Sequence, residues 1–125
     1  MNLQIQQALL QVIQTYKKQG PQWKPGKDLI HLKKRISRRD VSVEFTLQDY
    51  NKLIVNVVTN VESDIHVYRL NGFHQSYFAF SANNWIIILG QNAIMETAMK
   101  TSSSKRYLSE EKGYTYIGTV KEVFS

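Results

Sequence analysis

Hydrophobic positions in the first half of the chain follow a helical period. Between residues 2 and 18 apolar residues recur every three to four positions, which predicts an amphipathic helix. The stretch "QGPQWKPG" then interrupts the pattern with prolines and glycines and predicts a loop. We expect a second helix from Leu29 to about Arg38, with Asp28 as its N-cap, and a third amphipathic helix capped by Thr46.

From residue 64 the hydrophobic period changes to two. Four short β-rich segments follow one another, separated by turn residues: "DIHVYRL", "QSYFAFS", "NWIIILG" and "AIMETAMK". A polar surface loop, "KTSSSKRYLSEEKG", leads to "YTYIGTVKEVF", which fits a closing strand or a helix. The pattern predicts an α+β fold in which amino-terminal helices pack on one face of a four- to five-stranded antiparallel sheet.

Length and composition fit one domain. A chain of 125 residues is close to the usual domain size, so we expect a single domain over residues 1–125. Residues 27–125 are expected to form its core, and the helix within residues 1–20 is left open as a peripheral element. No segment approaches the roughly 20 apolar residues that span a bilayer, so no membrane partner is expected. The absence of cysteine excludes disulfides, thiolate metal sites and cysteine nucleophiles.

Positive charge is concentrated in one part of the chain. The net charge is +6, and nine of the 16 Lys and Arg residues lie between Lys17 and Arg39, where Asp28 is the only acid. Such segregation favours a polyanionic partner, of which nucleic acid is the commonest. A solvated basic face that aids solubility is the alternative interpretation.

A helical wheel separates two faces of the predicted second helix. Three apolar residues fall within roughly 60° of one another at 100° per residue: Leu29, Leu32 and Ile36. Four basic or titratable residues cluster on the opposite side: His31, Lys34, Arg35 and Arg38. We therefore expect the apolar residues to face the core and the cationic residues to point outward. His31 and Arg35, four positions apart, should be neighbours on that outer face.

Several classes of chemistry have no sequence support. The three histidines lie in different predicted elements without metal-ligand spacing, and the chain contains no HExxH, P-loop, GxGxxG or GxSxG motif. We therefore expect neither a metal nor a cofactor. Metal-free acid–base chemistry remains, and RNA suits it because its 2′-hydroxyl is a built-in nucleophile. A histidine beside Arg and Lys offers the necessary groups, although His31 also fits an ordinary surface histidine on a basic helix.

The order of these segments resembles a known superfamily. "HLKKRI" on an early helix, a second helix and then "IHVYRL", "YFAF", "WIIILG" and "AIMETAMK" resemble the RelE/colicin D/EndoU/barnase-type superfamily of small metal-independent RNases, many of them toxins. The resemblance covers roughly residues 27 to 120. It implies that His31 acts as base or acid, Arg35 as a phosphate clamp, and Thr97 as a ligand of the scissile phosphate.

The resemblance leaves the second proton-transfer group open. The chain departs from the superfamily in having only one helix histidine. We take Tyr116 as the candidate, with Tyr114, Thr115 and His66 as alternatives, for supplying a proton or stacking a base. One aromatic of "YFAF" should also face away from the core and be free to stack. Six cations are expected to contact the substrate: Lys27, Lys33, Lys34, Arg38, Lys105 and Arg106.

The expected function is therefore a toxin-like, metal-independent endoribonuclease that cleaves tRNA or mRNA and leaves 2′,3′-cyclic phosphate ends. A non-catalytic nucleic-acid-binding module, using the same basic face, is one alternative. The other is an interaction domain that docks an acidic partner such as an immunity protein or antitoxin. The expected site of action is the cytoplasm, and delivery as part of a larger secreted toxin is left open.

Overall fold

Helices come first in the chain and a sheet follows. The computed structural model describes residues 1–124. Its first three helices are α1 (Leu3–Gln19), α2 (Lys27–Ser37) and α3 (Leu47–Thr59). The sheet contains β1 (His66–Asn71), β2 (Ser76–Ala82), β3 (Trp85–Gly90), β4 (Met95–Lys100) and β5 (Tyr114–Thr119). Between β4 and β5 lie α4 (Ser104–Tyr107) and the 3-10 helix η1 (Glu110–Lys112), and α5 (Val120–Val123) follows β5.

Local signals explain where the helices begin. Thr46 and Asp49 form a capping box at α3, in which each side chain accepts a hydrogen bond from the other residue's backbone N–H. The predicted Thr46 cap is thus confirmed. By contrast, α2 begins at Lys27, two residues before its predicted start, because Gly26 adopts a left-handed conformation (φ 79°) as the N-cap. Asp28 lies in the first turn, where its carboxylate accepts a hydrogen bond from the backbone N–H of Leu29.

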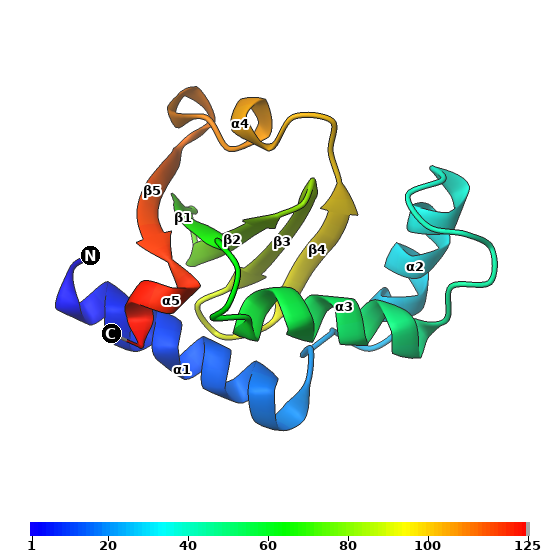
Figure 1. Ribbon diagram of the computed structural model, residues 1–125, viewed down its shortest axis with the longest axis horizontal. Helices are drawn as coiled ribbons and strands as arrows, with labels where there is room; N and C mark the ends of the chain where they lie inside the picture. The colour runs from blue at the N-terminus through cyan, green and yellow to red at the C-terminus, as the bar shows by residue number, and fades with distance from the viewer. Residues whose placement is uncertain (125) are drawn as a thin grey trace.

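The predicted α+β class is confirmed. All strand pairs are antiparallel, and the strand order is β4-β3-β2-β1-β5. α1 and α3 cover one face, α2 lies beside the β4 edge, and the segment containing α4 passes over the other face (Figure 1). The carboxyl-terminal segment, for which strand and helix were both open, forms β5 and then α5.

The main core lies between the helices and the sheet. Side chains from the helical layer meet those from β1, β2 and β3, and all six residues of β3 are buried. The first helix is not peripheral, as the sequence had left open, because it contributes four buried residues to this core: Leu9, Val12, Ile13 and Tyr16. The Tyr16 hydroxyl also donates a hydrogen bond to the Ala93 carbonyl.

A second, smaller apolar cluster occupies the opposite face of the sheet. It contains Ala79, Ile86, Ile88, Leu108 and Tyr114. Leu108 comes from the segment between β4 and β5, so this segment covers part of a sheet face that would otherwise be open. Within residues 1–124, no helix combines the length and the hydropathy that crossing a membrane requires.

Candidate active site

α2 presents a different face to the protein from the one predicted. Leu29 is 52% exposed, whereas Arg35 is only 2% exposed and Leu32 is buried beside it. The wheel correctly gave the angles between side chains but not which side meets the rest of the fold. The helix packs against α3 and β4, and the buried side runs through Leu32 and Arg35, with His31 at its margin.

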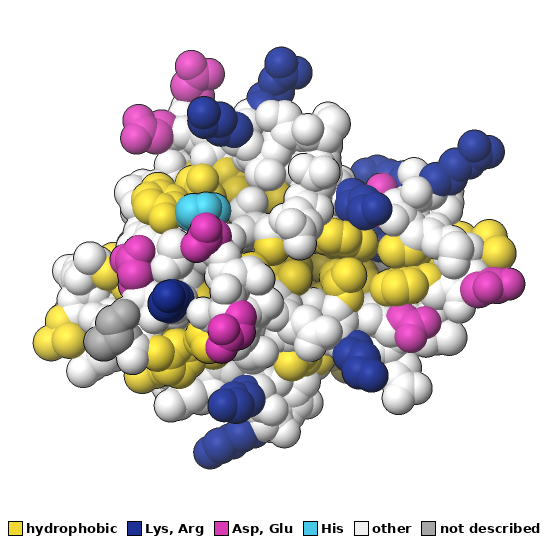
Figure 2. Space-filling view, in the orientation of Figure 1, with side chains coloured by type: hydrophobic (Ala, Val, Ile, Leu, Met, Phe, Trp, Pro, Cys, Tyr) yellow, Lys and Arg dark blue, Asp and Glu magenta, His cyan; other side chains and the backbone are white. Residues whose placement is uncertain are grey.

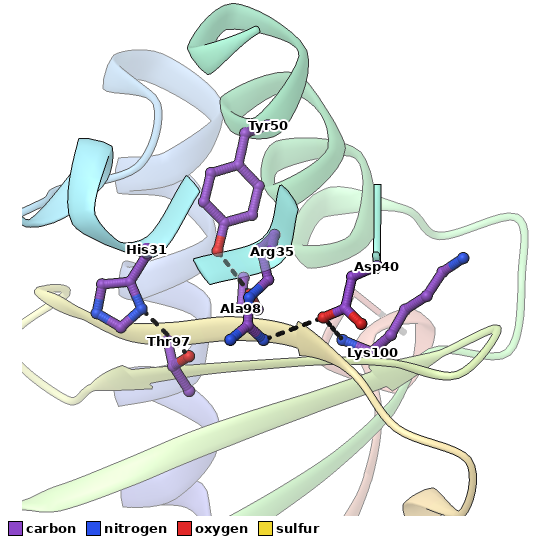
Figure 3. A network of polar contacts seen from close by, with 7 residues as sticks. All are labelled: His31, Arg35, Asp40, Tyr50, Thr97, Ala98 and Lys100. Atoms are coloured by element: carbon purple, nitrogen blue, oxygen red, sulfur yellow. Dashed lines mark hydrogen bonds and ion pairs between the residues drawn. The ribbon is translucent and has the colours of Figure 1, made fainter. Parts of the chain in front are cut away.

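Arg35 is part of a structural contact. Its Nη1 lies 3.3 Å from Asp40 Oδ2, and the same carboxylate oxygen accepts a hydrogen bond from the backbone N–H of Lys100 on β4 (Figure 3). Nε of Arg35 has no hydrogen-bond partner among the described residues. A buried, ion-paired guanidinium cannot reach a phosphate in solution. The predicted outward position of Arg35 is therefore wrong, and its burial gives no support to a role as phosphate clamp; the residue instead ties α2 to β4.

His31 meets Thr97, as the resemblance implied. The imidazole is half-buried, and its Nδ1 lies 3.5 Å from Thr97 Oγ1, at the upper limit of a hydrogen bond (Figure 3). On its other side the ring stacks at a tilt against Trp23, with 5.2 Å between ring centroids. These two neighbours restrict the ring while leaving part of it open to solvent.

A bulge in β4 brings a carboxylate to the same place. The register shifts so that Ile88 pairs with Thr97 but Leu89 pairs with Met95, which leaves Glu96 without a partner in β3. Thr97 shares the Ile88 side of the sheet, opposite α1 and α3. Both Glu96 and Thr97 line a cleft together with His31.

This cleft, hereafter the His31 cleft, has a volume of about 410 Å³, a size typical of small-molecule sites. At the β4 edge it is lined by His31, Glu96 and Thr97. Farther across the sheet it is lined by Leu70, Ile88 and three tyrosines: Tyr77, Tyr107 and Tyr114. Polar groups thus lie at one end of the cleft and aromatic rings at the other.

The surroundings of His31 favour the neutral imidazole. Burial lowers its pKa below 6.5, and the positive charges of Lys34, Arg35 and Lys27 lower it further. The carboxylate of Glu96 raises this pKa and so acts in the opposite direction. The balance leaves His31 unprotonated at neutral pH and able to accept a proton.

The surroundings of Tyr114 favour its neutral, protonated hydroxyl. Burial, followed by the neighbouring Tyr107, raises the pKa of Tyr114 to about 12. Its hydroxyl therefore keeps its proton at neutral pH and is available as a hydrogen-bond donor. The Tyr107 and Tyr114 rings lie 6.1 Å apart between centroids, and Lys112 Nζ lies 5.2 Å from the centre of the Tyr107 ring.

The other predicted site residues are scattered around this cleft or away from it. Tyr116 is 50% exposed and does not line the cleft; its hydroxyl lies 3.0 Å from Nδ1 of His66. The six predicted substrate-binding cations are all exposed: Lys27, Lys33, Lys34 and Arg38 on or next to α2, and Lys105 and Arg106 on α4. Lys and Arg side chains project over both α2 and the segment containing α4 in Figure 2.

A second hollow of comparable size offers less chemistry. It measures about 450 Å³ and lies between α3 and the β2–β3 hairpin, with Asp49 as its only carboxylate. That carboxylate is already used in the α3 capping box. No histidine lines this hollow, so we place the candidate site in the His31 cleft. Within residues 1–124 no group of three or more His, Asp or Glu side chains is arranged to hold a metal ion.

Sequence reasoning did not assign Glu96 or Tyr107, and it named Tyr114 only as an alternative. The bulge that exposes Glu96 has no mark in the sequence. Tyr77 was accessible from strand alternation, because it lies on the face opposite Phe78 and Phe80, whereas Tyr114 is itself buried in the second cluster. Comparisons of the chain with protein-family models, curated proteins and solved structures found no match.

Proposed function

We propose that this protein is a metal-independent endoribonuclease whose active site is the His31 cleft. The observation that carries the proposal is the meeting of three groups at one end of an open cleft: the His31 imidazole, the Thr97 hydroxyl and the Glu96 carboxylate. Exposed cations of α2 flank this end. A phosphodiester needs such surroundings, because positive charge binds the anion while a neutral imidazole accepts a proton.

In the proposed reaction the RNA supplies its own nucleophile. His31 accepts the proton of the 2′-hydroxyl as the O2′–P bond forms, and the Glu96 carboxylate stabilises the resulting imidazolium. Lys34 and the Thr97 hydroxyl stabilise the negative charge on the nonbridging phosphate oxygens. The P–O5′ bond then breaks, and the leaving 5′-oxygen takes a proton from water. The products are a 2′,3′-cyclic phosphate and a 5′-hydroxyl, and the hydroxide so formed is neutralised by the proton that the His31 imidazolium returns to solvent.

The first test is RNA cleavage in the presence of EDTA. We expect wild-type protein to cleave a labelled, largely unstructured RNA and leave 2′,3′-cyclic phosphate ends. His31→Ala should lower the rate by about 10²- to 10⁴-fold, the usual contribution of a general acid or base. His66→Ala decides between the two histidines, because His66 contacts Tyr116 outside the cleft and its loss should leave the rate unchanged. Intact RNA with wild-type protein, or equal rates for His31→Ala and wild type, would contradict the proposal.

A non-catalytic role in nucleic-acid binding is the second candidate. The exposed cations of α2 favour it, since Lys33, Lys34 and Arg38 need no cleft to contact phosphates. This alternative predicts RNA binding without any change in RNA length, and equal binding by His31→Ala and wild type. The same cations would suit an acidic partner protein such as an immunity protein or antitoxin, which gel filtration of the mixed proteins would detect.

A further inference from the structure

The aromatic end of the His31 cleft has the composition of a nucleobase site. Tyr77, Leu70 and Tyr114 are directly paired across β2, β1 and β5, so they form one row on the sheet face opposite α1 and α3. Tyr107 from α4 completes this end of the cleft. Aromatic rings stack on bases regardless of sequence, whereas a phosphate would require charged partners.

The position of Tyr77 is restricted by the β1–β2 turn. A Cβ atom at Gly72 would lie 2.9 Å from Cε2 of Tyr77 and 2.4 Å from the Gln75 carbonyl oxygen, so the turn backbone packs directly against the tyrosine ring. The ring is therefore held in place before any ligand binds. Preorganisation of this kind reduces the conformational entropy that is lost on binding.

Polar and aromatic ends of the cleft are separated by a short distance. Thr97 is on β4 and Tyr77 is on β2, two strands away and two residues farther along the register, which corresponds to ~12 Å at the usual strand spacing and rise. One nucleotide spans such a gap, with its phosphate near His31 and its base near Tyr77. The volume of about 410 Å³ leaves room for one nucleotide rather than for a base pair.

We propose that the tyrosine end of the His31 cleft binds the base of the nucleotide whose 2′-hydroxyl attacks, so that the enzyme selects an unpaired nucleotide. This inference rests on the proposed ribonuclease function and specifies its substrate class. A base in a duplex is stacked between its neighbours and cannot enter the cleft, whereas a base in a loop or single strand can. Because stacking is tolerant of base identity, selection depends on pairing more than on sequence.

The substrate test uses a DNA oligonucleotide that contains a single ribonucleotide and hence one 2′-hydroxyl. Three versions are compared: the ribonucleotide unpaired, the same residue paired in a duplex, and an unpaired ribose with hydrogen in place of the base. We expect the unpaired nucleotide to be cleaved about 5- to 140-fold faster than the baseless one, from the usual contribution of base stacking. The duplex should be cleaved more slowly still.

Variants link this preference to the tyrosines. Tyr77→Leu should slow cleavage of the unpaired nucleotide to the rate of the baseless substrate, and Tyr107→Leu should have the same effect in smaller degree. Tyr77→Phe should keep the preference, because it retains the ring. Phe124→Leu is the matched control, since Phe124 is an exposed aromatic on the α1 side of the sheet and lines a different hollow. Circular dichroism melting identifies any variant that has not folded.

Failure of the inference and failure of the function are distinguishable. If His31→Ala abolishes cleavage but base removal and Tyr77→Leu leave the rate unchanged, the base site is overturned and the ribonuclease stands. If no substrate is cleaved, NMR titration with a 2′-deoxyadenosine 3′,5′-bisphosphate tests the site alone. Shifts of the Tyr77 ring signals that inorganic phosphate does not reproduce would support the base site, and their absence would overturn it.

Discussion

The protonation of His31 is set by opposing neighbours. Burial and the positive charges of Lys34, Arg35 and Lys27 lower its pKa, and Glu96 raises it. The two effects come from different elements, since the cations belong to α2 and Glu96 belongs to the bulge in β4. Each can therefore be removed separately without changing the imidazole itself.

We predict opposite pKa changes for two substitutions. Lys34→Ala removes a charge that lowers the pKa of His31, so this pKa should rise; Glu96→Gln removes a charge that raises it, so the pKa should fall. Lys33→Ala is the matched control, because Lys33 is exposed on the same helix but is not among the groups that shift His31. An NMR titration of the His31 Cε1 proton measures all three. Shifts of the same sign for Lys34→Ala and Glu96→Gln would refute the assignment.

The rate of cleavage should follow this titration. If His31 is the base, activity falls as the pH drops through the His31 pKa, because protonated imidazole cannot accept the 2′-hydroxyl proton. That acidic limb should lie below pH 6.5 in wild-type protein, move to higher pH in Lys34→Ala and move to lower pH in Glu96→Gln. A limb that stays in place in both variants would show that another group is titrating.

Sequence reasoning correctly kept His31 out of the core but misplaced Arg35, and the difference has a physical cause. Both were assigned to an outward cationic face because their wheel positions oppose those of Leu29 and Ile36. Asp40 lies just beyond the end of α2 and supplies a counter-charge, so Arg35 can be buried whereas a lone cation could not. The sequence contains both residues but does not show that the chain folds back to bring them together.

At the scale of elements, the orientation of α2 depends on a small set of polar contacts with β4. The Arg35–Asp40 ion pair and the bond from the Lys100 backbone N–H to Asp40 connect the end of α2 to this strand. Nearby, the Tyr50 hydroxyl of α3 donates a 2.6 Å hydrogen bond to the Ala98 carbonyl of the same strand. These contacts fix α2 and α3 on β4 and so hold His31 at Thr97.

Breaking the ion pair should destabilise the protein more than replacing it. Asp40→Asn leaves the buried guanidinium without its counter-charge and should cost ~3–5 kcal/mol in the free energy of unfolding, measured with urea. The double variant Arg35→Met/Asp40→Asn should be closer to wild type, because no buried charge is left unpaired. Glu44→Gln, an exposed change of the same type, should stay within about 0.5 kcal/mol. If Arg35 instead bound phosphate, Arg35→Met would weaken RNA binding while stability stayed unchanged.

The hydrophobic pattern was sufficient to locate most of the helices and strands, although it left the segment of β5 and α5 open. Helical spacing located α1 and α3, alternation located β1, β2 and β4, and a short apolar run between turn residues located β3. The hydrophobic pattern did not predict the β-bulge in β4 or the segment that covers the second face of the sheet. The residue at which β4 slips past β3, and the segment that covers the second face through Tyr107 and Leu108, depend on packing between distant parts of the chain. These two features complete the cleft, so only the structure shows that the tyrosines and His31 line the same cleft.

At the scale of the whole molecule, exposed cations lie near both ends of the His31 cleft. The exposed cations of α2 are next to the His31 end of the cleft, and those of α4 are next to Tyr107. Lys17 and Lys18 belong to the same basic stretch of sequence but lie at the end of α1, on the other face of the sheet. The fold thus divides one basic stretch of sequence between two sides of the protein.

This division predicts how salt should affect binding of a single strand that lacks 2′-hydroxyls and cannot be cleaved. Lys34/Arg38→Ala and Lys17/Lys18→Ala each reduce the net charge from +6 by two units. Each phosphate contact on a single strand contributes about 0.7 to the slope of log affinity against log salt, so the first variant should reduce the slope by about 1.4 if both cations contact phosphates. The second should leave it unchanged. Equal losses in the two variants would mean that net charge, rather than the α2 surface, attracts the nucleic acid, and binding would then give no support to a site beside His31.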